Sequence, residues 1–301
     1  MSSSNTLSTL FPPQASKQKY QHINHDSIRE DPYYWMRNRD NPDVITYIEA
    51  ENSYTEAKTS SQKPLRKKLF NEILSRIQED DISVPVEING FWYYHKTLEG
   101  KPYGIYCRRK GSMDSSEEVL LDLNAIADGC DYFNLGTFSI SHDQTKLAYS
   151  IDITGREIYE LCIKDLNSGQ LLKDLPNEII GDVIWSKNDD FIFYTKMDKT
   201  LRPHQVFRHE LGAKTNADQL IYEEQDSKFR LGLGESRSEE FIFLHSESSI
   251  TTEIQFMSSL TPKASFQIFC PRHEGHEYSI EHQASRWLIL TNDSNNEDGS
   301  H

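Results

Sequence analysis

The 301 residues include 36% hydrophobic and 11% aromatic residues, and the formal net charge is −15. A chain of this length and aromatic content can bury a sizeable core, which excludes an intrinsically disordered protein. The acidic balance argues against a nucleic-acid-binding surface, because phosphate recognition depends on Lys and Arg.

Cysteine usage and the start of the chain predict a cytoplasmic protein. The cysteines are widely spaced and form no CxxC pair, which favours reduced thiols over disulfides or a zinc site; they are Cys107, Cys130, Cys162 and Cys270. Residues 1–16 contain no basic n-region and no long apolar run, so no signal peptide is expected. No stretch approaches the ~20 apolar residues of a membrane-spanning helix, so we expect no membrane contact.

Residues 1–80 predict an N-terminal arm with two helices. Asn41 can cap a helix that has Pro42 at its first position, an arrangement that helix termini favour. One face of this helix carries Val44, Tyr47, Ile48 and Tyr54. A second helix is predicted after Pro64, with apolar residues at four-residue spacing: Leu65, Leu69, Ile73 and Ile77. Both apolar stripes require a surface to pack against.

Residues 81–301 predict a partial β-propeller. Short apolar runs with period-two character begin at residues 147, 191, 241 and 287, which are 44, 50 and 46 residues apart. A repeat of about 45 residues is typical of four-stranded propeller blades. A polar turn precedes each of the first three runs, and an alternating strand follows: residues 157–163, 205–209 and 253–257. A β-sandwich does not explain this register.

The repeat count predicts about four blades and the beginning of a fifth. An imperfect unit with the run Phe91-Trp92-Tyr93-Tyr94 precedes three nearly complete units. The last run, at residues 287–290, leads into a polar, turn-like tail. The propeller is therefore expected to be incomplete. Its large aromatic residues, including Trp92, Trp185 and Trp287, are expected in the core between blades.

Several stretches resemble the prolyl oligopeptidase family of serine peptidases. The N-terminal signature consists of Asp31-Pro32-Tyr33-Tyr34-Trp35 and residues 47–55. Three further stretches are similar to the oligopeptidase B branch: Gly155-Arg156-Glu157-Ile158-Tyr159, residues 202–212 and residues 222–226. The resemblance extends from about residue 17 to about residue 293.

The resemblance implies a seven-bladed propeller that caps an α/β-hydrolase domain and admits only short peptides. In the oligopeptidase B branch these peptides are cleaved after Arg or Lys, so short basic peptides are the implied substrates of the complete enzyme. The α/β-hydrolase domain is absent from these residues, and no G-x-S-x-G motif is found. The nearest string, Gly234-Glu235-Ser236-Arg237-Ser238, lacks the second glycine and a following helix. No catalytic residue is assigned, and this chain alone is expected to be non-catalytic.

Other motifs are interpreted as turns. Ser141-His142-Asp143 contains triad residue types, but neighbours in sequence cannot assemble a triad. His273-Glu274-Gly275-His276 lacks metal-site helix spacing and predicts a hairpin turn, so no metal site is assigned. No cofactor-binding fingerprint is present. The candidates for contact with substrate or with another domain are charged turn residues: Arg156, Glu157, Arg202 and His204. The alternative for each is a solvated turn.

Three functional hypotheses remain open. The chain is the propeller part of an oligopeptidase-B-like endopeptidase, or one chain of a split peptidase whose separate partner supplies the α/β-hydrolase domain. The third hypothesis is a free-standing propeller that binds proteins or peptides.

Overall fold

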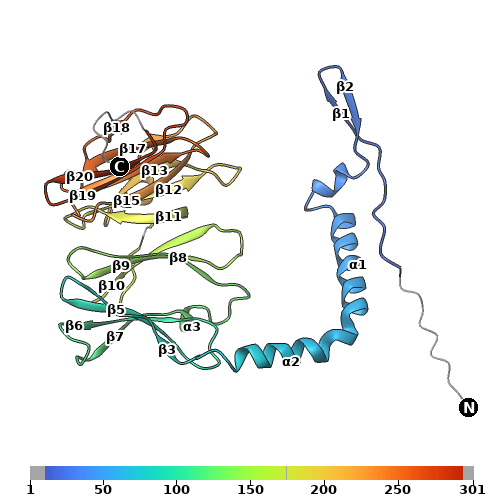
Figure 1. Cartoon of the computed structure of the whole chain (residues 1–301), viewed down its shortest axis with the longest axis horizontal. Coiled ribbons are helices and arrows are strands. Elements are labelled where there is room, and N and C mark those ends of the chain that lie inside the picture. The colour runs from blue at the N-terminus through green and yellow to red at the C-terminus, as the bar shows by residue number, and fades with distance from the viewer. Residues whose placement is uncertain (1–10, 174, 294–301) are drawn as a thin grey trace, which may run out of the picture. The chain divides into compact units, whose positions relative to one another are not determined.

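The computed structural model describes residues 11–173 and 175–293, and the chain divides into two compact units between Gln78 and Glu79 (Figure 1). Among the described residues, none of the helices combines the length and apolar character needed to cross a membrane.

The N-terminal unit contains a hairpin followed by helices. Strands β1 (Gln21–Asn24) and β2 (Ser27–Glu30) pair antiparallel, and the segments that follow are η1 (Tyr34–Arg37), α1 (Pro42–Thr59), η2 (Ser60–Gln62) and α2 (Lys63–Leu74). The Asn41 side chain accepts a hydrogen bond of 3.0 Å from the backbone N–H of Asp43, which confirms the predicted cap. Helix α2 begins at Lys63, so Pro64 lies in its first turn, where the missing N–H costs no helical hydrogen bond.

The apolar stripe of α2 stays exposed in this unit. Leu65 is 57% exposed, Leu69 47% and Ile73 61%. Ile77, predicted to continue this stripe, lies beyond the end of α2 at Leu74 and is 57% exposed. On α1, by contrast, Val44 is only 4% exposed. Nothing in the described residues of the N-terminal unit covers the α2 stripe.

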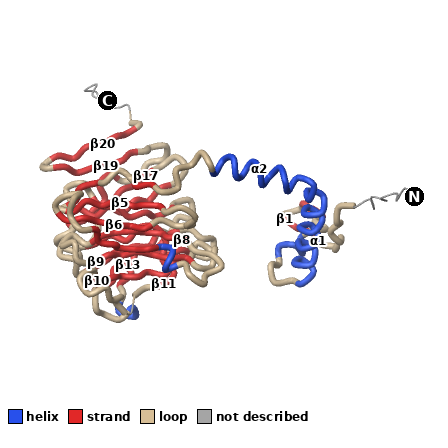
Figure 2. Tube along the Cα trace, turned by 90° about the horizontal axis from the view of Figure 1, so that it is seen from below, coloured by secondary structure: helices blue, strands red, loops and turns tan. Residues whose placement is uncertain are grey.

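The second unit is a partial β-propeller, which confirms the predicted mainly-β architecture (Figure 2). Blade 1 comprises β3 (Asp81–Ile82), β4 (Val86–Ile88), β5 (Phe91–Thr97), β6 (Ile105–Lys110) and β7 (Glu117–Asp122), and the short helix α3 (Leu123–Ile126) follows. Blade 2 comprises β8 (Asn134–Ile140), β9 (Lys146–Asp152) and β10 (Tyr159–Asp165). Blade 3 comprises β11 (Asn177–Trp185), β12 (Phe191–Met197), β13 (Pro203–Glu210), η3 (Thr215–Ala217) and β14 (Gln219–Glu223).

Blade 4 comprises β15 (Arg230–Glu235), β16 (Phe241–Glu247), β17 (Thr252–Ser258) and β18 (Gln267–Cys270), and a hairpin of β19 (Tyr278–Gln283) and β20 (Arg286–Thr291) begins blade 5. All strand pairings are antiparallel. Blades 2 and 3 are joined, because the start of β11 pairs with β10 as well as β12. Gly181, at φ 71°, lies where the register between β11 and β12 shifts.

The hydrophobic core lies between blades rather than within them. Trp185 and Ile192 of blade 3 pack with Leu161 of blade 2, and Phe193 of blade 3 packs with Leu233 of blade 4. Trp185 is 2% exposed, which confirms its prediction as core. Trp287 packs beside the cluster between blades 4 and 5.

The prediction that Trp92 belongs to the core between blades is wrong. Trp92 is half-buried and lies in none of the core clusters, and its indole N–H donates to the Gly111 carbonyl within blade 1, at 3.3 Å. Period-two alternation in a strand does not reveal which face meets a neighbouring blade.

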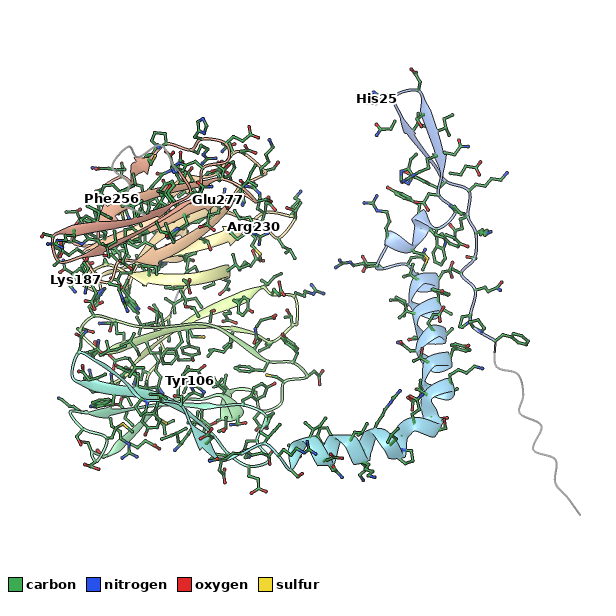
Figure 3. All side chains as sticks on the ribbon, viewed as in Figure 1. His25, Tyr106, Lys187, Arg230, Phe256 and Glu277 are labelled. Carbon is green, nitrogen blue, oxygen red and sulfur yellow. The ribbon has the colours of Figure 1, made fainter. Side chains whose placement is uncertain are left out.

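The propeller has two distinct ends. Since successive strands run antiparallel, the loops β5–β6, β9–β10, β12–β13 and β16–β17 lie at one end, here called the loop face. The turns β4–β5, β8–β9, β11–β12 and β15–β16 lie at the opposite end, the turn face. Figure 3 shows Arg230, at the start of β15, on the opposite side of the propeller from Lys187 in the β11–β12 turn.

Candidate functional site

The loop face is where the chain enters the propeller. Residue Asp81 pairs with Thr97 at the end of β5, and the Thr97 hydroxyl donates to the Glu79 carbonyl at 2.6 Å. The backbone N–H of Glu99 donates to the Asp80 carboxylate at 2.7 Å. The segment that leads into the propeller is therefore hydrogen-bonded to the β5–β6 loop.

The β9–β10 loop is organised by one buried carboxylate. Asp152 is 1% exposed and accepts the backbone N–H groups of Thr154, Gly155 and Glu157 at 2.7, 3.1 and 2.8 Å. The Thr154 hydroxyl also donates to it, at 2.7 Å. Burial by itself raises the pKa of Asp152, but these hydrogen bonds outweigh it and hold the pKa below its ordinary value. Hydrogen bonds to this one carboxylate therefore hold the conformation of the loop.

The β12–β13 loop repeats the same arrangement in the next blade. Asp198 accepts the backbone N–H and the hydroxyl of Thr200 at 2.7 and 2.6 Å, and the backbone N–H of Arg202 at 3.2 Å. The hydrogen bonds from Thr200 are the largest cause that lowers the pKa of Asp198. Both loops share the pattern Asp-x-Thr-x-Arg, which ends at Arg156 in blade 2 and at Arg202 in blade 3.

The two equivalent arginines have different surroundings. The Arg202 guanidinium donates to Asp198 at 2.9 Å and to the Phe229 carbonyl at 2.9 Å, so it ties its loop to the connection that leads into blade 4. Arg156 is exposed, and its side chain has no hydrogen bond or ion pair within the described residues. Arg202 thus joins its loop to blade 4, whereas Arg156 presents a free guanidinium, within the described residues, on the loop that Asp152 holds.

The other two predicted site residues lie beside these arginines. Glu157 is exposed, at φ 59°, and its backbone N–H completes the Asp152 loop. His204 lies at the start of β13, where its carbonyl accepts the Glu224 N–H at 2.8 Å. Its Nε2 is 3.9 Å from Glu223, and its buried Nδ1 has no hydrogen-bond partner among the described residues. The structure therefore places Arg156 and Glu157 in the β9–β10 loop, Arg202 in the β12–β13 loop and His204 at the start of β13, all at the loop face. Among the described residues, no hydrogen bond or ion pair joins the pair in blade 2 to the pair in blade 3.

The turn face carries a cluster that the sequence interpretation missed. His142 Nδ1 is 3.1 Å from Asp189 Oδ1, and Nε2 is 2.7 Å from Glu235 Oε1. Nearby, Lys187 forms an ion pair with Glu239. A depression of about 430 Å³ is lined by turns of four successive blades; its residues are Asn89, His142, Asp143, Lys187, Asn188, Asp189 and Glu239. The only signal in the sequence was the recurrence of an acidic residue in the β11–β12 and β15–β16 turns.

The motifs interpreted as turns have that geometry. Ser141 donates to Asp143 at 2.6 Å within the turn, while the His142 ring is directed to other blades. Gly234 and Glu235 end β15, and a turn leads into strand β16 instead of the helix that a nucleophile elbow requires. The His273 carbonyl accepts the His276 N–H at 3.0 Å, which closes a reverse turn.

The chain is similar in sequence to the N-terminal part of known peptidases. Residues 12–297 match the family model described as prolyl oligopeptidase, N-terminal beta-propeller domain. "Protease 2" of Moraxella lacunata is 37% identical over 288 residues, which is 93% of this chain and 42% of that protein. "Dipeptidyl aminopeptidase BI" of Pseudoxanthomonas mexicana is 37% identical over 286 residues, which is 89% of this chain and 39% of that protein.

Two solved structures have the same arrangement of strands. Oligopeptidase B from Leishmania major has a TM-score of 0.88 at 27% identity, covering 95% of this chain and 43% of that one. Oligopeptidase B from Trypanosoma brucei, in its closed form with covalently bound antipain, has a TM-score of 0.85 at 25% identity and covers 94% and 43%. The chain thus spans about two fifths of the length of the relatives that it matches.

Proposed function

The chain belongs to the prolyl oligopeptidase family and corresponds to the N-terminal β-propeller domain of its members, and we propose that this domain is the peptide-selecting cap of an oligopeptidase-B-like serine endopeptidase. The observation that carries this proposal is the similarity to oligopeptidase B from Leishmania major over 95% of the chain. The complete enzyme would cleave short peptides after Arg or Lys, and the propeller would exclude large folded proteins.

The 301 residues alone are proposed to be non-catalytic. Hydrolysis through an acyl-enzyme needs a nucleophile, a base and oxyanion donors. The sequence has no G-x-S-x-G elbow, and its nearest string lies in a strand–turn–strand segment. In the proposed assembly, an α/β-hydrolase portion supplies these groups, on the same polypeptide or on a separate one.

The hydrolase portion is proposed to face the loop face. The chain enters the propeller there, at residues 79–82, and the free guanidinium of Arg156 is presented on the same end. Arg156 and Glu157 would contact the hydrolase portion or a bound peptide directly. Arg202 and His204 would act by holding the neighbouring loop. The exposed stripe of α2 would be covered in the same assembly.

A free-standing binding module is the weaker alternative. Such a propeller needs its blade faces covered, yet Leu288, Ile289 and Leu290 of β20 are 55%, 54% and 77% exposed in the described residues. Apolar side chains on both faces of a strand are characteristic of a blade with a neighbour on each side.

The proposal is tested by complementation. The purified chain is treated with a fluorophosphonate serine-hydrolase probe and a short fluorogenic peptide that ends in Arg, alone and mixed with the remaining portion of Moraxella lacunata Protease 2. The chain alone is expected to neither label nor cleave, and the mixture is expected to do both. Labelling of the chain alone, with contaminants excluded, would overturn the non-catalytic assignment.

The selecting role is tested in the same mixture. The rate with the Arg-ended peptide is compared with the rate with a large folded protein that exposes Arg residues, and the Protease 2 portion without this chain is the control. Addition of the chain should raise the peptide rate without raising the protein rate. An equal gain on both substrates would contradict a role as cap.

A further inference from the structure

The His142 ring joins three blades at the turn face. His142 belongs to the β8–β9 turn of blade 2, Asp189 to the β11–β12 turn of blade 3, and Glu235 to the end of β15 in blade 4. The His142 side chain is 11% exposed and the Asp189 side chain 5% exposed, so the contact between them is largely shielded from water. The Glu235 side chain is 29% exposed.

The hydrogen-bond pattern requires a charged ring. A carboxylate accepts hydrogen bonds and donates none, while a neutral imidazole has only one N–H. Both contacts of His142 are therefore satisfied together only by the imidazolium, which donates from Nδ1 and Nε2. Burial by itself lowers the pKa of His142, but the hydrogen bonds to Asp189 and Glu235 outweigh it and raise the pKa to about 9.

Asp189 reinforces the contact through the backbone. Its Oδ1 accepts the backbone N–H of His142 and its Oδ2 accepts that of Asp143, each at 2.8 Å. Asp189 has a positive φ of 57°, which is uncommon for a residue with a side chain and is maintained here by these contacts. One carboxylate thus holds the whole β8–β9 turn.

The contact is one of a series along the turn face. In each turn, the residue with positive φ reaches the preceding blade: Gln144 at φ 63°, Asp189 at 57° and Glu239 at 58°. Their partners are, in order, Tyr93, His142 and Lys187. Among these three partners, within the described residues, His142 differs because its ring contacts blade 4, at Glu235, as well as blade 3, at Asp189.

We propose that His142, protonated at neutral pH, is a latch that holds the β8–β9 turn, the β11–β12 turn and the end of β15 together, and so joins blades 2, 3 and 4 around the depression on the turn face. The charged groups around this latch are Asp189 and Lys187 from the β11–β12 turn, Glu235 from β15, Glu239 from the β15–β16 turn and Asp143 from its own turn. Lys187 is engaged by Glu239, so His142 is the cation that the Asp189 and Glu235 carboxylates share. Loss of its proton at alkaline pH releases the link to one of them.

The first test is a titration of the His142 ring by NMR in the purified chain, with the resonance assigned by its loss in His142→Gln. The midpoint is expected near pH 9, compared with about 6.5 for an unperturbed histidine. A midpoint at or below pH 7 would overturn the proposal. This measurement needs only the wild-type chain to be folded, since the other assigned histidines identify the remaining resonance if the variant does not fold.

The second test is amide hydrogen exchange at pH 7 in His142→Gln. Exchange at the backbone amides of residues 142 and 143, which donate to Asp189 in the wild type, should rise at least tenfold, while the Ser238 amide, which donates to the His282 carbonyl, should not change. His95→Gln, at an exposed histidine of blade 1, is the matched control and should leave all three unchanged. Unchanged exchange in the β8–β9 turn would contradict the latch.

Discussion

The ring of Tyr159 lies directly across the backbone of Gly136, so closely that a Cβ at residue 136 would be 2.7 Å from the ring carbon Cδ1. The same Cβ would be 2.4 Å from the Ser150 hydroxyl, which accepts the Thr137 N–H at 2.9 Å. Strands β8, β9 and β10 therefore meet at a point where only glycine fits. The Tyr159 hydroxyl accepts a hydrogen bond from Asn134 at 2.7 Å, which fixes the ring in this position.

Gly136→Ala is expected to destabilise the propeller by about 1–3 kcal/mol, the usual range for an overpacked site. The added Cβ has to displace either the Tyr159 ring or the Ser150 hydroxyl. Urea unfolding measures the loss. Gly232→Ala is the control, because its Cβ would meet its nearest neighbour, in His245, at 3.9 Å, an ordinary contact. Equal unfolding midpoints for the two variants would contradict the prediction.

Arg272 is expected to contribute more to stability than other arginines. Its guanidinium donates to Glu224 at 2.7 Å and to Glu253 at 3.0 Å, and these two residues are 5% and 6% exposed. Arg272→Met leaves both carboxylates buried without their cation, which costs about 3–5 kcal/mol.

Thermal unfolding at pH 7 measures the effect of Arg272→Met, and Arg237→Met is the matched control at an exposed position. The control should change the unfolding free energy by less than about 0.5 kcal/mol. A second check is the triple variant with Glu224→Gln and Glu253→Gln added, which should recover part of the loss because the amides need no counter-charge. If Arg272→Met unfolds like Arg237→Met, the buried carboxylates do not depend on this cation.

Alkaline pH is expected to weaken the propeller through His142. Its folded-state pKa is raised to about 9, and an unfolded histidine titrates near about 6.5. The stability contributed by the charged ring is therefore fully present below about pH 6.5 and is lost as the pH rises toward 9. Its upper limit is roughly 3 kcal/mol, at about 1.4 kcal/mol for each pKa unit.

The measurement is the melting temperature at intervals between pH 6 and 9.5. The decline in the wild-type chain should be steeper than in His142→Gln, and His95→Gln should follow the wild type. Parallel curves for the wild type and His142→Gln would show that another group causes the decline in melting temperature at alkaline pH.

Alanine variants of the two equivalent arginines are expected to differ: Arg202→Ala should lower the unfolding free energy, and Arg156→Ala should lower the rate of peptide cleavage. Arg202→Ala removes hydrogen bonds to Asp198 and Phe229 and should cost about 1.5–3 kcal/mol. Arg156→Ala removes no contact within the described residues and should change the unfolding free energy by less than about 0.5 kcal/mol. In the complementation assay, Arg156→Ala should nevertheless lower the rate of peptide cleavage. An unchanged rate would place Arg156 in a solvated turn.

The strands and the N-terminal helices were predictable because their signals are local. Short apolar runs bounded by polar turns mark β9, β12 and β16, and a cap followed by proline marks the start of α1. The position of Trp92 was not predictable, because alternation identifies the two faces of a strand without identifying their neighbours.

The two Asp-x-Thr-x-Arg loops show that a local sequence pattern does not determine the hydrogen-bond partners of its side chains. The sequence contains both, yet only the structure distinguishes a bonded Arg202 from a free Arg156, since the acceptor of Arg202 is a carbonyl 27 residues further along the chain. The resemblance identified the family, and the blade repeat identified the loops, but neither specified which arginine is available.

The sequence by itself determined the blade repeat, the two helices of the arm and the absence of a nucleophile elbow. Each strand, turn, helix start or elbow motif is recognised from a short run of neighbouring residues, and the repeat follows from the regular spacing of such runs. Only the tertiary structure decided that His142 meets Asp189 and Glu235, which are 47 and 93 residues away. Those contacts form because packing of apolar faces between blades brings the turns of successive repeats to one end, and no local pattern records which side chains then meet.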